Sequence, residues 1–233
     1  MKLNLSGELI PSDWAEIYRK HGYESGFYCP DDVRKAIQDL DPGEELTLEI
    51  NSIGGSVFAG NEIYSLLEGC ENPTRAIIQS MAASAASYMI MSCNHISIHL
   101  PAQLMIHRAS TVAWGNAEDM EQAQQMLTVT DASILDTYCR RCGDRVSREQ
   151  LQSMMENETY IGAQDALNYG LVDSIVGASN SNAAQSGILV ASAFNNTVKA
   201  MRTLPDIQQL IAAEKNENAQ LRKELEIEKN KYI

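Results

Sequence analysis

The sequence predicts an α/β fold with a mostly parallel sheet. Short apolar runs such as "LTLEI" and "TRAII" alternate along the chain with segments whose apolar residues recur every three to four positions. The 233 residues are 44% hydrophobic and 21% charged, which is ordinary for a globular protein with a sizeable core. This alternation is typical of parallel strands joined by helical crossovers, so we expect that class up to residue 176.

The first part of the chain contains two predicted strands and three predicted helices. "LNLSGELI" alternates like a strand, and "SDWAEIYRK" follows it as a short helix. "CPDDVRKAIQDL" reads as a helix that begins at Pro30, with the acids of its first turn at the end where the helix dipole favours negative charge. "GEELTLEINS" is predicted to be a strand that leads into the helix "AGNEIYSLLEGC".

The next part repeats the pattern and then adds a long helix. "TRAIIQS", "HISIHL" and "AQLMIH" are predicted strands, with "AASAASYMIMSC" as a helix between the first two. Residues 117–141 predict one long helix with an imperfect apolar stripe of Met120, Ala123, Leu127, Ile134 and Tyr138. "SREQLQSMM" and "AQDALNYG" predict two further helices, and "LVDSIV" a closing strand.

The composition changes after Val176. Residues 177–202 are small and polar, which predicts a linker. Residues 203–233 carry many charges and a thin apolar stripe, which predicts a helical or coiled-coil tail. The main domain is therefore expected to span residues 1–176.

Charge and cysteine content narrow the classes of function. The net charge is −13 with no cluster of Lys and Arg, which argues against a nucleic-acid surface. The sequence has no run of about 18 apolar residues, so no membrane span is predicted. The first residues lack the apolar core of a signal peptide. Five cysteines, an odd number, fit reduced thiols, so we expect a cytoplasmic protein.

Adjacent glycines at Gly54 and Gly55 separate a predicted strand from a predicted helix. Glycine permits a close approach of backbone to another group, and neighbouring amides at such a turn can point into one space. Donors of this kind stabilise the oxyanion of an acyl-transfer intermediate. A purely structural turn is the alternative.

Ser84 lies within tiny residues where a strand is predicted to become a helix. Small neighbours leave its hydroxyl accessible, and the start of a helix favours a developing negative charge. The amide of Ala85 would then be a second oxyanion donor. Close helix packing through Ala and Ser is the alternative explanation.

A serine nucleophile needs a base, and His107 is the best placed of four histidines. It ends the apolar strand "LMIH" and precedes a polar loop, where site residues commonly lie. His95 and His99 share one face of a predicted strand and could contribute to a metal site, but no third ligand is evident. The single "CRRC" motif is interpreted as incidental.

Four segments in order, "INSIGGSVFAGNEIY", "MAASAASYMIM", "LMIHRAS" and "AQDALNYGLVDSIV", resemble the signature segments of ClpP-type serine peptidases. The resemblance covers about residues 3–176 and is strongest to the phage and prophage branch, the ClpP-related head maturation proteases. It implies the ClpP/crotonase-type spiral of β-β-α units, with residues 117–141 as a projecting handle helix, and so a ClpP-like peptidase domain over residues 1–176.

The resemblance also implies a role for individual residues. Ser84 matches the family's nucleophile, His107 its general base, and the amides of Gly55 and Ala85 its oxyanion donors. The backbone of Ile53, Gly54, Ser56 and Val57 falls where the family binds substrate as an added β-strand. The loop "RASTVAWGN" would cover the other side of the substrate.

Two positions depart from the family pattern. Ile53 stands where a proline is usual, although both glycines are kept. Glu158 stands where the triad aspartate is usual; glutamate can orient an imidazole as aspartate does, and Asp173 is the fallback. A solvent-facing acid near a helix end is the alternative interpretation of Glu158.

The resemblance implies an ATP-independent serine endopeptidase, without metal or nucleotide cofactor in this chain, that forms a homo-oligomeric ring, often a heptamer or a tetradecamer. Its polypeptide substrates would be capsid or scaffold proteins during phage head maturation, in the host cytoplasm or the procapsid. Alternatives are a housekeeping peptidase that works with an unfoldase, a crotonase-type acyl-CoA enzyme, and an inactive ring-forming assembly protein.

Overall fold

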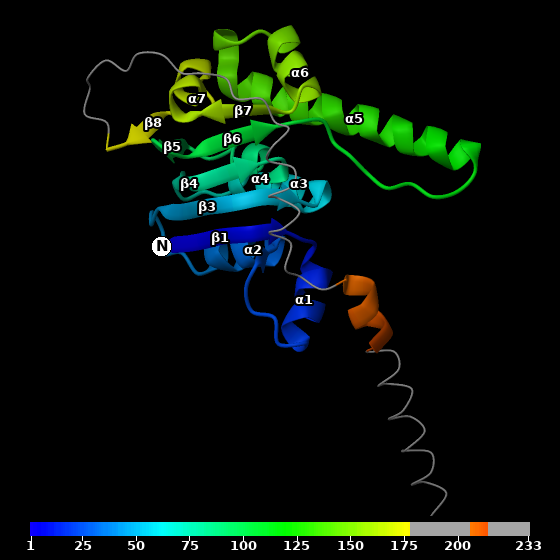
Figure 1. The fold of residues 1–233 in the computed structure, drawn as a ribbon. Coiled ribbons are helices and arrows are strands. Elements are labelled where there is room, and N and C mark those ends of the chain that lie inside the picture. Colours follow the sequence, from blue (N-terminus) through cyan, green and yellow to red (C-terminus); the bar gives the residue numbers. More distant parts are fainter. Residues whose placement is uncertain (178–205, 214–233) are drawn as a thin grey trace, which may run out of the picture.

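The structure is a computed structural model that describes residues 1–177 and 206–213. Its centre is an eight-stranded sheet in the order β2-β1-β3-β4-β5-β8, with β6 pairing to both β4 and β7 (Figure 1). Every strand pair is parallel except β6 with β7. The predicted α/β class with a mostly parallel sheet is therefore confirmed.

The elements of the main domain follow one another closely. The strands are β1 (Lys2–Leu9), β2 (Phe27–Tyr28), β3 (Leu46–Gly55), β4 (Thr74–Ala83), β5 (His95–His99), β6 (Gln103–Ile106), β7 (Thr159–Gly162) and β8 (Ser174–Val176). The helices are α1 (Ser12–Lys20), α2 (Pro30–Gln38), α3 (Val57–Glu68), α4 (Ala85–Tyr88), α5 (Ala117–Cys142), α6 (Arg148–Glu156) and α7 (Ala163–Tyr169), with a 3₁₀ turn at Gly143–Arg145.

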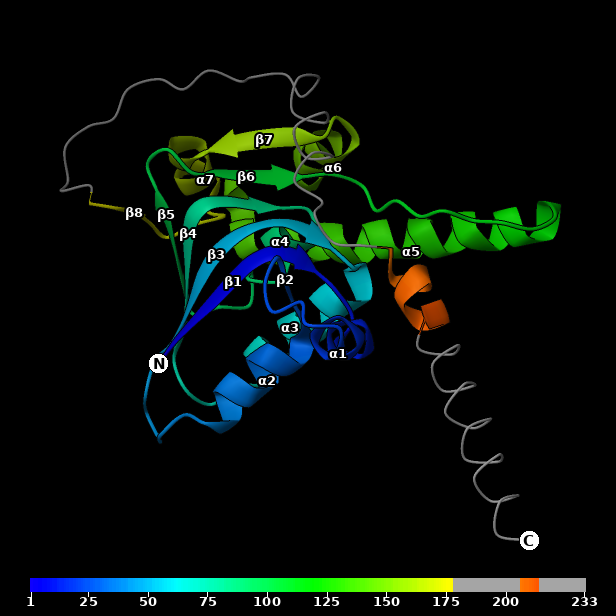
Figure 2. The ribbon, with the colours of Figure 1, turned by 60° about the horizontal axis from the view of Figure 1, so that its bottom comes forward.

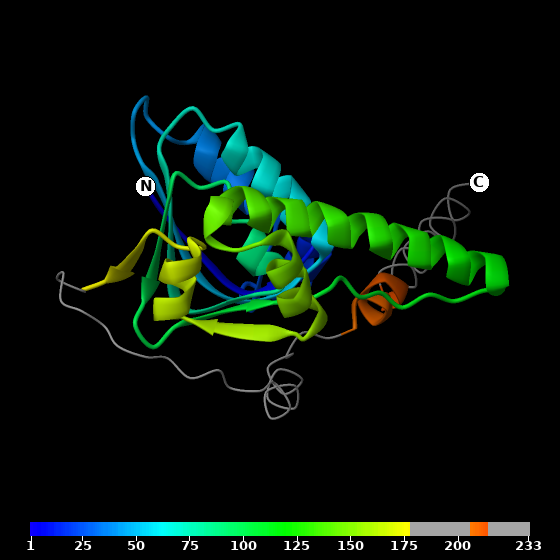
Figure 3. The ribbon, with the colours of Figure 1, turned by 90° about the horizontal axis from the view of Figure 1, so that it is seen from above.

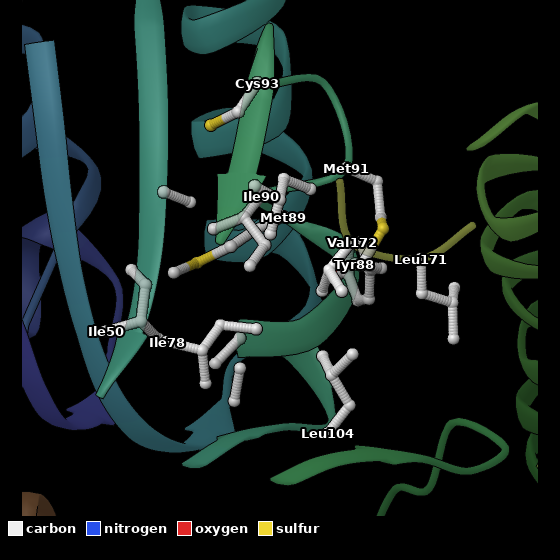
Figure 4. Close-up of a cluster of buried hydrophobic side chains, with 14 of the residues drawn as sticks. Ile50, Ile78, Tyr88, Met89, Ile90, Met91, Cys93, Leu104, Leu171 and Val172 are labelled. Carbon is white, nitrogen blue, oxygen red and sulfur yellow. The ribbon is translucent and has the colours of Figure 1, made fainter. Parts of the chain in front are cut away.

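The core lies between the sheet and the helices α2, α3 and α4 on one of its faces (Figure 2). Ile50, Ile78 and Leu104 come from three neighbouring strands and are fully buried with Met89 and Ile90, which follow α4 (Figure 4). Burying each such side chain contributes about 1.5–3 kcal/mol. This packing fixes the strand ends that form the site described below.

Strand β4 changes partner along its length. Residues 75–78 pair with β5, whereas residues 81–83 pair with β6. Both partners run parallel to β4, so β4 and β6 end at the same edge of the sheet. Strands β1 and β3 also end there, because Leu9 pairs with Gly55.

Helix α5 projects from the body of the domain, and the loop that precedes it runs beside it from the body to its tip (Figure 3). Only its second half is buried, through Ile134, Leu135, Tyr138 and Cys142. In its first half the predicted stripe is only partly buried: Ala123 and Leu127 are half-buried, and the prediction was wrong for Met120, which is exposed.

Residues 207–213 form a helix that packs against α1. Ile207 is buried with Ala15, Tyr18 and Phe27, while Leu210 and Ile211 are partly buried at the same cluster. The predicted linker, beyond Gly177, lies outside the described residues. So does the predicted tail, apart from residues 206–213.

Three elements differ from the sequence prediction. The strands β2 and β7 were not predicted. Each is too short to show a sequence pattern and is stabilised by pairing, β2 with β1 and β7 with β6. The helix expected over "AASAASYMIMSC" is regular only at Ala85–Tyr88, because turns replace it from Met89 onward. Within the described residues, no helix is long and apolar enough to cross a membrane.

Candidate active site

Ser84 occupies the junction between β4 and α4. Its backbone has φ 55°, in the left-handed region that non-glycine residues rarely adopt. Such strain persists only where the surroundings hold it, and it is concentrated at functional sites. Here the amide of Ser84 donates to the carbonyl of Met105 at 2.9 Å, and the buried Ala83 and Ala85 on either side leave room for the sharp turn.

His107 follows the last residue of β6 and contacts the serine directly. Its Nε2 lies 2.7 Å from Ser84 Oγ, within hydrogen-bond distance. The register explains the contact: Ala83 pairs with Met105, so Ser84 and His107 both lie just beyond the ends of two neighbouring parallel strands. The structure thus brings together the two residues that the sequence predicted as nucleophile and base.

The surroundings of His107 suit a neutral base. Burial lowers the pKa of His107 below its ordinary value, while the carboxylates of Glu158 and, to a smaller degree, Asp131 act in the opposite direction. Burial disfavours the charged ring, and its effect on the pKa is larger than that of the two carboxylates. A neutral imidazole can accept the hydroxyl proton of Ser84, and the two carboxylates then favour the imidazolium that forms.

Glu158 faces His107 across the antiparallel pair β6–β7. Met105 pairs with Tyr160 and Ile106 with Thr159, so the same register continued by one residue sets His107 opposite Glu158. Glu158 has φ 46°, the second non-glycine residue with positive φ in the described chain. No hydrogen bond joins its side chain to His107 within residues 1–177.

The glycine pair approaches two different backbones. A Cβ on Gly54 would lie 2.6 Å from the carbonyl oxygen of Ala83 and 2.9 Å from the amide nitrogen of Ala85. A Cβ on Gly55 would lie 2.0 Å from the carbonyl oxygen of Leu9. Both glycines also have positive φ, 88° and 152°. Gly54 is therefore needed where β3 packs against the turn that carries Ser84, and Gly55 where β3 packs against the end of β1.

The two expected oxyanion donors are the backbone amides of Gly55 and Ala85. The amide of Ala85 is the first of α4, and first amides have no acceptor within their own helix. Gly55 ends β3 and lines a cavity beside the site. Ala85 is the residue after Ser84, whereas Gly55 lies against Leu9 of β1, and the role of both amides as donors stays a prediction.

A groove of about 410 Å³ runs from the ends of β1 and β3 to the middle of α5. Gly55, Ser56 and Val57 line it, as do Ala109, Ser110 and Thr111 of the loop after His107. Apolar residues on its walls include Leu9, Ile10, Phe58, Met126 and Leu127. Ile53 and Gly54, which we expected to contact substrate, do not line it; Gly54 packs against Ser84 instead.

Two buried hydroxyl groups support the site and were not predicted for that role. Ser87 Oγ donates to the carbonyl of Ser84 at 2.6 Å and lies 2.6 Å from Tyr138 Oη of α5. Ser52 Oγ accepts from the amide of Gly54 at 3.1 Å and from Tyr28 Oη at 2.9 Å. Sequence patterns give no signal for the bonds to Tyr138 and Tyr28, because these partners are distant along the chain.

The remaining candidate residues lie elsewhere. Asp173 accepts from the amide of Ile96 at 2.7 Å and pairs with Arg141. Ile96 pairs with Ala76, seven residues along β4 from Ala83, which is roughly 23 Å at about 3.3 Å per residue. Asp173 therefore does not complete the site.

Two other motifs have the following surroundings in the structure. His95 contacts Ser174 at 3.0 Å, and the described residues contain no group of three potential metal ligands. The cysteines of "CRRC" are free thiols, Cys142 being buried in the core.

Comparison with known proteins identifies the family of this chain. The Clp protease family matches residues 35–179, which is more than half of the chain. The chain belongs to the Clp protease family. It is therefore a serine endopeptidase of the ClpP type, and its mixed α/β architecture is that of the ClpP fold.

Curated members of the family cover most of the described domain. The ATP-dependent Clp protease proteolytic subunit of Deinococcus radiodurans is 31% identical over 149 residues, which are 63% of this chain and 72% of the relative. The ATP-dependent Clp protease proteolytic subunit 1 of Chlamydia muridarum is 28% identical over 141 residues, 58% of this chain and 71% of the relative.

Proposed function

We propose that Ser84, His107 and Glu158 form the catalytic triad of this Clp protease. The contact of 2.7 Å between Ser84 Oγ and His107 Nε2 carries the proposal. In the mechanism, Ser84 Oγ attacks the peptide carbonyl and His107 Nε2 takes its proton. His107 then gives that proton to the leaving amine, and a water molecule hydrolyses the acyl-enzyme by the reverse transfers.

Further roles follow from the position of the backbone. The amides of Gly55 and Ala85 would bind the oxyanion of each tetrahedral intermediate, where one donor is typically worth about 10²–10³ in rate. The segment from Ile53 to Val57 would pair with an extended substrate strand, while Ser56 and Val57 face the groove. Glu158 would hold the imidazole from across the β6–β7 pair.

Hydrolysis of an unfolded, fluorescently labelled polypeptide tests this assignment. We expect Ser84→Ala to abolish hydrolysis and Ser80→Ala to retain it, because Ser80 is an exposed hydroxyl on the same strand. Hydrolysis by Ser84→Ala at the wild-type rate would contradict the assignment. The contact of 2.7 Å between Ser84 and His107 argues against an inactive ring-forming protein, which has no use for an aligned pair.

We further propose a homo-oligomeric ring that cleaves phage capsid or scaffold proteins, on the sequence resemblance to the head maturation branch. The names of the two curated relatives support a second role, as the peptidase partner of an ATP-driven unfoldase. Adding a Clp-type unfoldase and ATP separates the two roles. Faster cleavage of a folded substrate would support the second role, and cleavage of capsid precursors by the chain alone would support the first.

A further inference from the structure

Asp131, in the middle of α5, binds the segment that follows His107. Its Oδ1 accepts from the amide of Ala109 at 2.7 Å, and its Oδ2 accepts from Arg108 Nε at 2.7 Å. The Asp131 side chain is only 15% exposed, whereas the Arg108 side chain is 57% exposed. One carboxylate thus holds both the backbone and the side chain of the two residues after the base.

This arrangement restricts the chain as it leaves β6. The amide of Arg108 donates to the carbonyl of Met155 at 3.2 Å, so α6 fixes one residue and α5 the next. A hydrogen bond to an ionised acceptor is worth about twice a neutral one. The bonds of Asp131 therefore fix the direction from which the His107 ring approaches Ser84.

Charged groups reach His107 from three elements. Glu158 lies opposite it in the β6–β7 register, Asp131 approaches from α5, and Arg108 is its neighbour in the chain. Glu156, at the end of α6, interacts with Arg108. Arg108 offsets part of the negative charge of Asp131, while Glu158 has no hydrogen-bonded cation within the described residues.

We propose that Asp131 is a positioning residue for His107, which holds the 107–109 segment in place and stabilises the imidazolium formed when Ser84 attacks. The proposal rests on the catalytic roles proposed above for Ser84 and His107. Ala109 also lines the groove, so the same carboxylate fixes one wall of the predicted substrate site.

The test is the pH dependence of labelling of Ser84 by a fluorophosphonate. Asp131→Asn keeps the shape of the side chain but loses its charge, and its amide nitrogen cannot accept one of the two hydrogen bonds. We expect the plateau rate to fall by about 10- to 100-fold. Because Asp131 favours the protonated ring, we also expect the midpoint of the acid limb to move to lower pH.

Two variants provide controls. Asp136→Asn removes an exposed carboxylate from the same helix, one that pairs with Arg148 and not with the His107 segment. It should leave the plateau and the midpoint unchanged. Asp131→Glu keeps the charge and should restore the wild-type midpoint, which a purely structural role would not predict.

A third variant should shift the midpoint of the acid limb in the opposite direction, and its result does not depend on whether Asp131→Asn folds. Arg108→Gln removes the exposed cation beside Asp131 and should move the midpoint to higher pH. Unchanged midpoints in both Asp131→Asn and Arg108→Gln, with labelled wild-type protein, would overturn the role of Asp131 alone. Absence of labelling at Ser84 in the wild type would instead overturn the proposed triad.

Discussion

Glu158 lies opposite His107 in the continued register of β6 and β7, although no hydrogen bond joins their side chains within the described residues. Glu158 directly precedes β7 and His107 directly follows β6, and the carboxylate acts on the imidazole through its charge. Catalytic hydrogen bonds are often long in the resting enzyme and shorten when substrate binds. This relationship makes the role of Glu158 directly testable.

Replacing Glu158 by Gln should reduce peptide hydrolysis by about 10²- to 10⁴-fold, because the amide cannot stabilise the imidazolium. Glu158→Asp should recover part of the rate. Glu71→Gln, at an exposed position before β4, is the control and should behave as the wild type. A fully active Glu158→Gln variant would leave Asp131 as the acid that supports His107.

The labelling rate of Ser84 should depend on pH through a single ionisation of His107. Burial lowers the pKa of His107 in the folded protein, so the neutral and reactive form persists to more acidic pH than for an ordinary histidine. We therefore expect a midpoint below about 6.5. A midpoint clearly above that value would show that the two carboxylates outweigh burial.

The close packing of Gly54 predicts a specific loss in Gly54→Ala. Gly43 has a similar φ of 81° with nothing near its Cβ position, so Gly43→Ala measures the backbone cost alone, about 1–2 kcal/mol. Gly54→Ala adds contacts of 2.6–2.9 Å with the turn around Ser84. In urea unfolding, it should destabilise the protein by more than Gly43→Ala and also abolish labelling of Ser84. Equal effects of both variants would show that the turn adapts.

The bond between Ser87 and Tyr138 links the turn of Ser84 to α5. Both hydroxyls are buried, so Tyr138→Phe leaves Ser87 Oγ with one partner fewer and should cost about 1–2 kcal/mol in free energy of unfolding. Tyr169→Phe, at the half-buried end of α7, is the control and should cost less. Unchanged stability and labelling in Tyr138→Phe would show that the bond to the Ser84 carbonyl suffices on its own.

Local patterns predicted the long elements well. The apolar run "LTLEI" is a strand buried along most of its length, and residues 117–141 lie in one helix that begins at a capped Asn116. The same patterns missed β7, whose four residues are a strand only because β6 lies beside them. They also extended the helix after Ser84 too far, since buried turns can be as apolar as a buried helix.

The site was predictable where a motif and a strand end coincide. Ser84 and His107 each follow an apolar strand, so the parallel sheet brings them to one edge. Asp131 could not be predicted in the same way, because it lies in the middle of a long helix with acids at many positions. Its partner amide belongs to a loop whose path depends on tertiary packing rather than on local sequence.

The most direct test of the account is to treat the purified protein with a serine-directed fluorophosphonate and to map the adduct by mass spectrometry. The account predicts one adduct on Ser84, absent in Ser84→Ala and lost or strongly reduced in His107→Ala. An adduct on Ser80 or Ser87, or labelling of Ser84 that is as fast in His107→Ala, would contradict the claim that these two residues form an activated nucleophile.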